Sequence, residues 1–249
     1  MQCPHSDVQI ERCHRLLDST ESLIEKQGLI SFKLSQVSKE SELSNSTFYK
    51  LFESKEDLLV CCFLRNATSN HFSEFERLYP ELTSVEKVLI PIIFSFEATY
   101  FSPTFNLVRQ TAVNSMIWRL ASPEKVKVFE QRINQYWLAN NDYLALAVKQ
   151  GDLIATQDEV REHAQAITFF LSGCLSSFES RLIDRQFLHE KRQTLFRQLQ
   201  RVFLPYEWKE ELSLAKFERM GMRVHMYYQA NRDSFNSCRN CLAMQKEGA

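Results

Sequence analysis

Residues 32–58 read FKLSQVSKESELSNSTFYKLFESKEDL, and this stretch decides the fold of the N-terminal part of the chain. It predicts two short helices joined by a tight turn, followed by the start of another helix. Ser44 and Ser54 each precede a helical run, where a hydroxyl can accept a hydrogen bond from a first-turn N–H. The pattern therefore indicates a helix-turn-helix with its exit helix.

Apolar residues give each predicted helix a face to bury. Residues 8–27 carry them at three- and four-residue spacing, and Gly28 is placed to end that helix. The two helices of the motif have their own sets: Phe32, Leu34, Val37 and Leu43, then Phe48, Leu51 and Phe52. The remaining side chains of the last helix face outward: Asn45, Ser46, Thr47, Tyr49 and Lys50.

The composition is that of an all-α globular protein. Of 249 residues, 44% are hydrophobic and 24% charged, and the five glycines do not cluster as a phosphate-binding loop requires. The formal net charge of −1 argues neither for nor against nucleic-acid binding, because a binding face can be local.

The cysteines and the apolar stretches bear on localisation. Seven cysteines in a long chain favour reduced thiols over a disulfide scaffold. No basic-then-apolar signal pattern opens the sequence, and the stretch Val88–Phe96 is too short to cross a bilayer. We therefore expect a cytoplasmic protein with no membrane partner.

The order of these residues resembles the TetR family of bacterial transcriptional regulators. The likeness runs without a gap over about the first 60 residues, and its specific parts are Thr47-Phe48-Tyr49, Phe52 and Ser54-Lys55-Glu56. The resemblance implies an N-terminal three-helix DNA-binding domain and a larger helical domain for effector binding and dimerisation. We expect these at residues 1–58 and 59–204, with a C-terminal extension at 205–249 that is helical at first and mobile towards its end.

Three departures from the family pattern concern the DNA-binding segment. Glu42 and Ser46 replace two family glycines, and Glu42 at a left-handed turn position would cost on the order of 1 kcal/mol. Lys33 replaces a capping threonine, so we expect Ser31 or Ser35 to cap that helix. Residues 1–58 hold seven Lys/Arg and ten Asp/Glu, about −3, which is unfavourable for contacts with phosphate.

The resemblance implies a repressor that binds a two-fold symmetric DNA operator as a homodimer and is released by a small effector. The predicted DNA-binding residues are Lys33, Ser35, Asn45, Ser46, Thr47, Tyr49, Lys50 and Lys55. The acidic N-terminal segment leaves an alternative open, in which the same fold binds a partner protein instead of DNA.

Further helices are expected from Leu58 to about Tyr79 and at about 104–120, and aromatic residues are dense in this middle part of the chain. They predict core packing, with some lining a cavity for a small, largely apolar effector. The candidate effector residues are Phe94, Tyr100, Phe101, Arg109, Asn114, Trp118 and Trp137.

Two helices at about 158–186 and 188–204 fit the family's dimer interface. The predicted interface residues are Phe170, Gly173, Ser177, Phe178, Leu195, Leu199 and Phe203. The alternative is that these helices close the core of the single chain.

Catalytic and metal signatures are missing from the sequence. The six histidines are scattered, and no nucleophile elbow or H-E-x-x-H spacing is present. Cys238 and Cys241 form a C-x-x-C without the second pair that a zinc site needs, which leaves a redox role open. We expect no enzyme activity, no cofactor and no metal.

Overall fold

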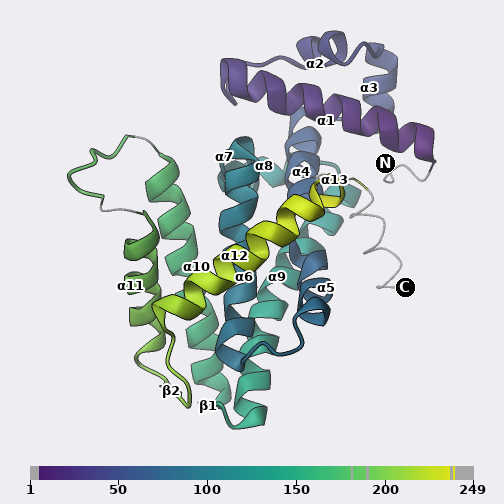
Figure 1. Ribbon diagram of the computed structural model, residues 1–249. Helices are drawn as coiled ribbons and strands as arrows, with labels where there is room; N and C mark the ends of the chain where they lie inside the picture. The colour runs from purple at the N-terminus through teal and green to yellow at the C-terminus, as the bar shows by residue number, and fades with distance from the viewer. Residues whose placement is uncertain (1–5, 181, 189–190, 236–237, 239–249) are drawn as a thin grey trace. The chain divides into compact units, whose positions relative to one another are not determined.

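The structure is a computed structural model that describes residues 6–180, 182–188, 191–235 and 238. Its elements are almost all helices, as expected for an all-α protein (Figure 1). In chain order they are α1 (Asp7–Gln27), α2 (Leu34–Glu40), α3 (Asn45–Leu51), α4 (Lys55–Asn66), η1 (Ser69–His71), α5 (Phe72–Leu78), α6 (Ser84–Phe101), α7 (Pro103–Ala112), α8 (Ser115–Trp118), α9 (Pro123–Gln150), β1 (Leu153–Ile154), α10 (Gln157–Glu179), α11 (Lys191–Phe203), β2 (Glu207–Trp208), α12 (Leu214–Ala230) and α13 (Arg232–Phe235).

The chain packs as two compact units that both draw on distant stretches of sequence. The first unit comprises 1–67, 98–133 and 231–249, and the second comprises 68–97 and 134–230. This grouping does not test the functional domain boundaries at residues 58 and 204, which stay a prediction. Each unit is described by itself below.

Capping residues set the ends of the first helices. Ser44 Oγ accepts from Thr47 N and Ser54 Oγ accepts from Asp57 N, as the sequence predicts. At α2 the prediction that Ser31 or Ser35 caps the helix is wrong, because Lys33 is the N-cap residue. Its backbone N donates to Gln36 Oε1 at 2.7 Å. The side chain at the third helical position thus accepts from the backbone of the N-cap residue, which is the reciprocal half of a capping box.

The core of the first unit joins α1, α2 and α3 to α4. Leu16, Val37, Phe48 and Phe52 are almost fully buried. Further along α4, the Phe63 ring stacks on Phe105 of α7 and meets the edge of Phe129 of α9. The helix-turn-helix therefore shares one core with α7 and the first part of α9.

A buried guanidinium ties α1 to α4. Arg65 is only 1% exposed, and its nitrogens lie 2.6 Å from both Asp18 Oδ1 and Glu21 Oε2 of α1. These carboxylates raise the pKa of Arg65 against the opposing effect of burial. Removing one partner of such a buried pair leaves an uncompensated charge, so the pairing fixes how α1 lies on α4.

Asp57 is a second buried charge, at the start of α4. Its side chain is fully buried, and Oδ2 accepts from Glu53 N at 2.9 Å. Oδ1 accepts from the backbone N of Ser122 at 2.6 Å, immediately before α9. The neighbouring cap Ser54 Oγ donates to Leu120 O at 3.4 Å. The exit helix of the motif is thereby bonded to the α8–α9 turn.

The second unit has an aromatic core to which the C-terminal extension contributes. Tyr227 of α12 meets the ring edges of Phe75 and Phe94, and Phe94 also meets Phe72. Along α12, Arg219 pairs with Glu86 of α6 at 2.6 Å. Figure 1 shows α12 running across α6. Within the described residues the extension is helical at α12 and α13, as expected, and α12 belongs to the second unit. The mobile segment expected at its end lies outside the described residues.

The only sheet that the described residues form also lies in the second unit. β1 and β2 pair antiparallel, with Leu153 opposite Trp208. Beside this pair, buried His163 of α10 stacks on Tyr206 at 3.9 Å and meets Phe203 edge-on. Burial lowers the pKa of His163 to about 3, so its imidazole stays neutral at physiological pH.

Some predicted helices are interrupted. The helix expected to run from Leu58 to Tyr79 ends at Asn66, whose side-chain amide donates to Cys62 O, and it resumes as η1 and α5. The helix expected at 104–120 breaks before Asn114, whose side chain accepts from Met116 N and starts α8. In both places an asparagine side chain bonds to the backbone, which favours a helix end.

No single helix in the described part of the chain is long and apolar enough to cross a membrane, and one bent pair, Ser84–Phe101 with Thr104–Ala112, passes that test by length and composition only.

We predict that Asp57→Asn destabilises the protein by about 1–3 kcal/mol, because it weakens two hydrogen bonds to a buried carboxylate. Urea unfolding followed by circular dichroism measures the loss. Glu56→Gln is the matched control, since it removes a carboxylate from the same helical turn at a partly exposed position. Equal losses in the two variants would mean that the helix dipole, and not the Ser122 contact, accounts for the effect.

Candidate nucleic-acid interface

Helix α3 presents a polar outer face. Asn45, Ser46, Tyr49 and Lys50 are exposed, and Thr47 is half-buried. The opposite face holds Phe48, 1% exposed, and Leu51. The outward residues are therefore those that the sequence predicts, and they include amide, hydroxyl and ammonium groups that can bond base edges or phosphates.

A cluster of hydroxyl groups organises the start of α3. Ser44 Oγ lies 2.9 Å from Ser46 Oγ and 3.0 Å from Thr47 Oγ1, and it also accepts from Thr47 N. The Phe48 ring meets the edge of the Tyr49 ring at 5.2 Å. Buried Phe48 thus supports an exposed tyrosine, which limits the positions its hydroxyl can take.

The turn before α3 has a left-handed residue. Among the described residues, Glu42 is the one non-glycine with a positive φ, at 55°. This is the position where the family pattern has glycine, and the strain expected from the sequence is present. Arg15 donates to Ser41 O and lies 3.6 Å from Glu42 Oε2, so α1 contacts the turn.

Four of the ten acidic residues in the N-terminal segment are engaged in contacts with other parts of the first unit. Asp57 is buried, Asp18 and Glu21 bond Arg65, and Glu40 bonds Lys26 at 3.0 Å. The sequence of α3 contains Lys50 and no acidic residue. The count of about −3 therefore overstates the negative charge at the outer face of this helix.

The other three predicted DNA-binding residues lie around α2 and α4. Lys33 and Ser35 are exposed at the start of α2. Lys55 Nζ donates to Phe32 O at 3.2 Å and lies 3.9 Å from the centroid of the Phe32 ring, and partial burial lowers its pKa. Its ammonium is engaged in holding the chain before α2, which the S-K-E motif alone does not reveal.

The candidate effector residues do not gather in one unit. Phe94 and Trp137 belong to the second unit, and Phe94 is fully buried in the aromatic core. The other five belong to the first unit: Tyr100, Phe101, Arg109, Asn114 and Trp118. Two of these have local roles, since Arg109 bonds Asn106 Oδ1 and Asn114 caps α8.

The predicted interface residues on α10 and α11 divide by burial. Leu199 and Phe203 are buried within the chain's own second unit, and Phe203 packs on His163. Gly173 is exposed, whereas four are half-buried: Phe170, Ser177, Phe178 and Leu195.

Phe169 is a surface residue that the sequence pattern does not single out. Its ring is 67% exposed on α10, and Gly173 lies one turn further along the same face. The four-residue spacing from Gly173 is the available signal.

Within the described residues, no group of three or more His, Cys, Asp or Glu side chains is arranged to hold a metal ion.

Helices α2 and α3, with the exposed polar face of α3, form a helix-turn-helix. Residues 16–61 match the sequence model described as "Bacterial regulatory proteins, tetR family". The match lies over the helix-turn-helix, in the segment where the resemblance was seen. A comparison with curated proteins gives no match.

Solved structures share the fold over most of the chain. FadR from Bacillus subtilis in complex with stearoyl-CoA is 17% identical with a TM-score of 0.57, covering 76% of this chain and 96% of that one. A tetR-family regulatory protein from Rhodococcus RHA1 is 12% identical with a TM-score of 0.58, covering 80% and 99%. PfmR from Thermus thermophilus is 13% identical with a TM-score of 0.55, covering 76% and 97%.

We predict that Glu42→Gly raises the free energy of unfolding by up to about 1 kcal/mol, because glycine adopts the left-handed conformation without steric cost. Chemical denaturation measures the gain. Glu42→Gln is the control, since it removes the charge and keeps the β-carbon. A gain of the same size in Glu42→Gln would assign the effect to charge and contradict the strain.

Proposed function

We propose that this regulator is a cytoplasmic transcriptional repressor, that it binds a two-fold symmetric operator as a homodimer, and that a small, largely apolar effector releases it. The observation that carries the proposal is the exposed polar face of α3, built on a buried Phe48 inside the segment that matches the tetR family. Asn45, Ser46, Thr47 and Lys50 would face base edges in the major groove. Tyr49 would contact phosphate.

The orientation of the charges supports DNA over a protein partner. The acidic segment was the reason to consider a partner-binding regulator. Arg65 neutralises Asp18 and Glu21, and Asp57 is enclosed by backbone donors. The outer face of α3 keeps one lysine and several hydroxyl and amide groups.

The nature of the effector is suggested by a structural neighbour and by the aromatic core of the second unit. That neighbour, FadR from Bacillus subtilis, was solved in complex with stearoyl-CoA. In the second unit, Phe72, Phe75, Phe94 and Tyr227 pack edge to face, and apolar rings of this kind would line a site for an acyl chain. An effector would weaken DNA binding if it bound a second conformation of the protein more tightly than it bound the operator-bound conformation.

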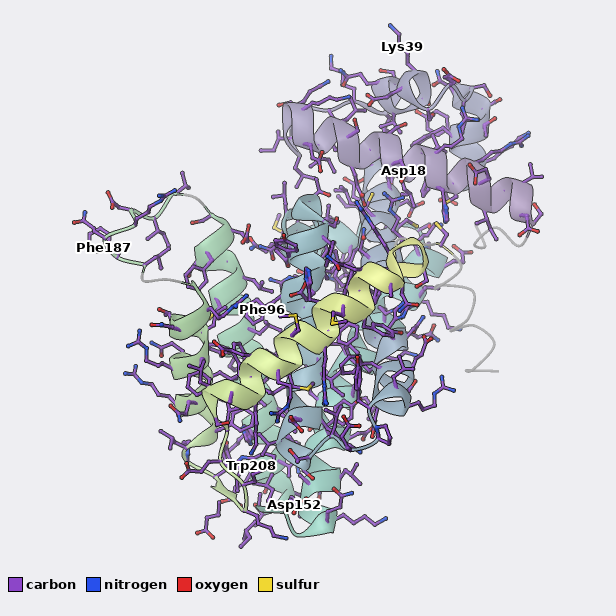
Figure 2. The ribbon with its side chains drawn as sticks, in the orientation of Figure 1. Asp18, Lys39, Phe96, Asp152, Phe187 and Trp208 are labelled. Atoms are coloured by element: carbon purple, nitrogen blue, oxygen red, sulfur yellow. The ribbon has the colours of Figure 1, made fainter. Side chains whose placement is uncertain are left out.

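We predict that Lys50→Ala weakens operator binding by roughly tenfold or more, because it removes a direct base or phosphate contact. Tyr49→Ala should weaken it as well. Fragments retained from sheared genomic DNA at low salt serve as the probe in a gel-shift titration. Lys39→Ala is the matched control, since Lys39 carries the same charge and projects outward from the end of α2 (Figure 2). Unchanged affinity in both α3 variants would contradict the proposed reading face.

The same assay separates the competing functions. DNA binding should weaken steeply as salt rises, because bound cations are released from phosphate. A protein that retains no fragment even at low salt would favour the partner-binding alternative. Stearoyl-CoA added to the complex, with coenzyme A alone as control, tests the class of effector by release of the DNA.

The proposed dimer surface is the outer face of α10. Exposed Phe169 stands beside exposed Gly173 and Ser176, so a second helix could approach closely at the small residues while the ring is buried. Half-buried Phe170, Ser177, Phe178 and Leu195 would extend the contact. Leu199 and Phe203 would support it from the core of the protomer.

We predict that Phe169→Glu converts the dimer to a monomer in light scattering, because it places a charge in the apolar centre of the interface. Phe187→Glu is the control: this phenylalanine is 73% exposed but lies in the α10–α11 connection (Figure 2). Dimers that persist in Phe169→Glu, or that are lost equally in both variants, would place the interface elsewhere.

A further inference from the structure

Two thiols from opposite ends of the sequence meet in the first unit. Cys13 lies on the buried face of α1, and Cys238 follows α13 near the C-terminus. Their Sγ atoms are 3.5 Å apart, and both side chains are buried. The backbone N of Cys238 also donates to His14 Nε2 at 2.8 Å. Two contacts therefore hold Cys238 against the same turn of α1.

The distance between the sulfurs is short enough for bond formation with little movement. A disulfide needs the sulfurs to approach to about 2.05 Å. The hydrogen bond to His14 fixes the backbone of Cys238, so the remaining adjustment falls mainly on the two side chains. Neither cysteine is disulfide-bonded in the structure.

The surroundings of Cys13 and of the nearby Cys62 shift the pKa values of their thiols in opposite directions. The hydrogen bond from Cys238 lowers the pKa of Cys13 against the opposing effect of burial, and the charges of Lys125 and Arg65 add to the lowering. Burial raises the pKa of Cys62 on α4 well above its usual range. Because the thiolate is the reactive form, Cys13 is the better nucleophile and Cys62 is inert.

We propose that Cys13 and Cys238 form an intramolecular disulfide on exposure to hydrogen peroxide, which makes the pair a reversible oxidation site. The Cys13 thiolate attacks one peroxide oxygen; an S–O bond forms, the O–O bond breaks, and the hydroxide released takes up the proton lost by Cys13 to give water. The Cys238 sulfur then attacks the sulfenic sulfur; the S–S bond forms, the S–O bond breaks, and the Cys238 proton leaves with the hydroxyl as a second water. Two thiols are oxidised and one peroxide is reduced.

The bond would join the C-terminal extension covalently to the first helix of the DNA-binding segment. Cys13 lies on α1 between Ile10 and Leu16, all of them buried, on the helix that Arg65 ties to α4. Oxidation would therefore restrain α1 through a covalent link, independently of any effector that binds the second unit. This inference does not depend on the operator or on the effector.

The test is disulfide mapping of the full-length chain after treatment with hydrogen peroxide. We expect the folded protein to lose two titratable thiols, to become lighter by two hydrogens, and to give one cross-linked peptide joining Cys13 to Cys238. Dithiothreitol should reverse all three changes. Cys13→Ser and Cys238→Ser should each abolish the cross-link, whereas Cys174→Ser and Cys241→Ser should keep it. Circular dichroism establishes that each variant is folded.

A second arm uses the unfolded chain. In urea the fold no longer brings residues 13 and 238 together, and the C-x-x-C spacing should favour a link between Cys238 and Cys241, which lies outside the described residues. A Cys238–Cys241 link in the folded protein would overturn the proposal. So would a link from Cys13 to Cys62, or irreversible oxidation of Cys13 with no cross-link.

Discussion

The Asp57 carboxylate is the interaction on which the rest of the first unit depends. It closes the N-terminus of α4 through Glu53 N and holds the turn before α9 through Ser122 N. A buried carboxylate is tolerated only when donors surround it. Because α4 is the exit helix of the helix-turn-helix, the orientation of the reading segment is set by backbone that lies far along the chain.

Some carboxylates of the N-terminal segment are used in contacts inside the first unit. Asp18 and Glu21 bond Arg65, and Asp57 bonds backbone donors, while α3 carries hydroxyl and amide groups with a single lysine. The net charge of the sequence does not show which carboxylates are engaged in internal contacts and which face solvent. Affinity for DNA would then depend on a few placed groups and on the pairing of two reading segments, rather than on a broad positive field.

Much of the first unit could be predicted from sequence because its signals are local. Hydroxyl caps at Ser44 and Ser54, the apolar spacing of α3 and the left-handed Glu42 are each decided within a few residues. The polar face of α3 follows directly from that spacing. These are the features for which periodicity and capping have a physical basis.

The contacts that the sequence did not reveal connect residues far apart. Nothing near Asp57 indicates that its partner is Ser122, because its place in the first turn of α4 suggests only an interaction with the helix dipole. Lys55, a predicted DNA-binding residue, also bonds the backbone at Phe32, and the motif gives no sign of this contact. The aromatic residues chosen for the effector site are divided between two units, because composition records how many rings there are and not where they meet.

The first unit is assembled from the beginning, the middle and the end of the chain. A fragment of residues 1–67 would contain the whole motif, but it would lack Ser122 to meet Asp57 and the rings of Phe105 and Phe129 to cover Phe63. The helix-turn-helix therefore shares its core with residues far along the chain. Because this core includes the Phe129 ring, it can be completed only after that later part of the chain has been synthesised.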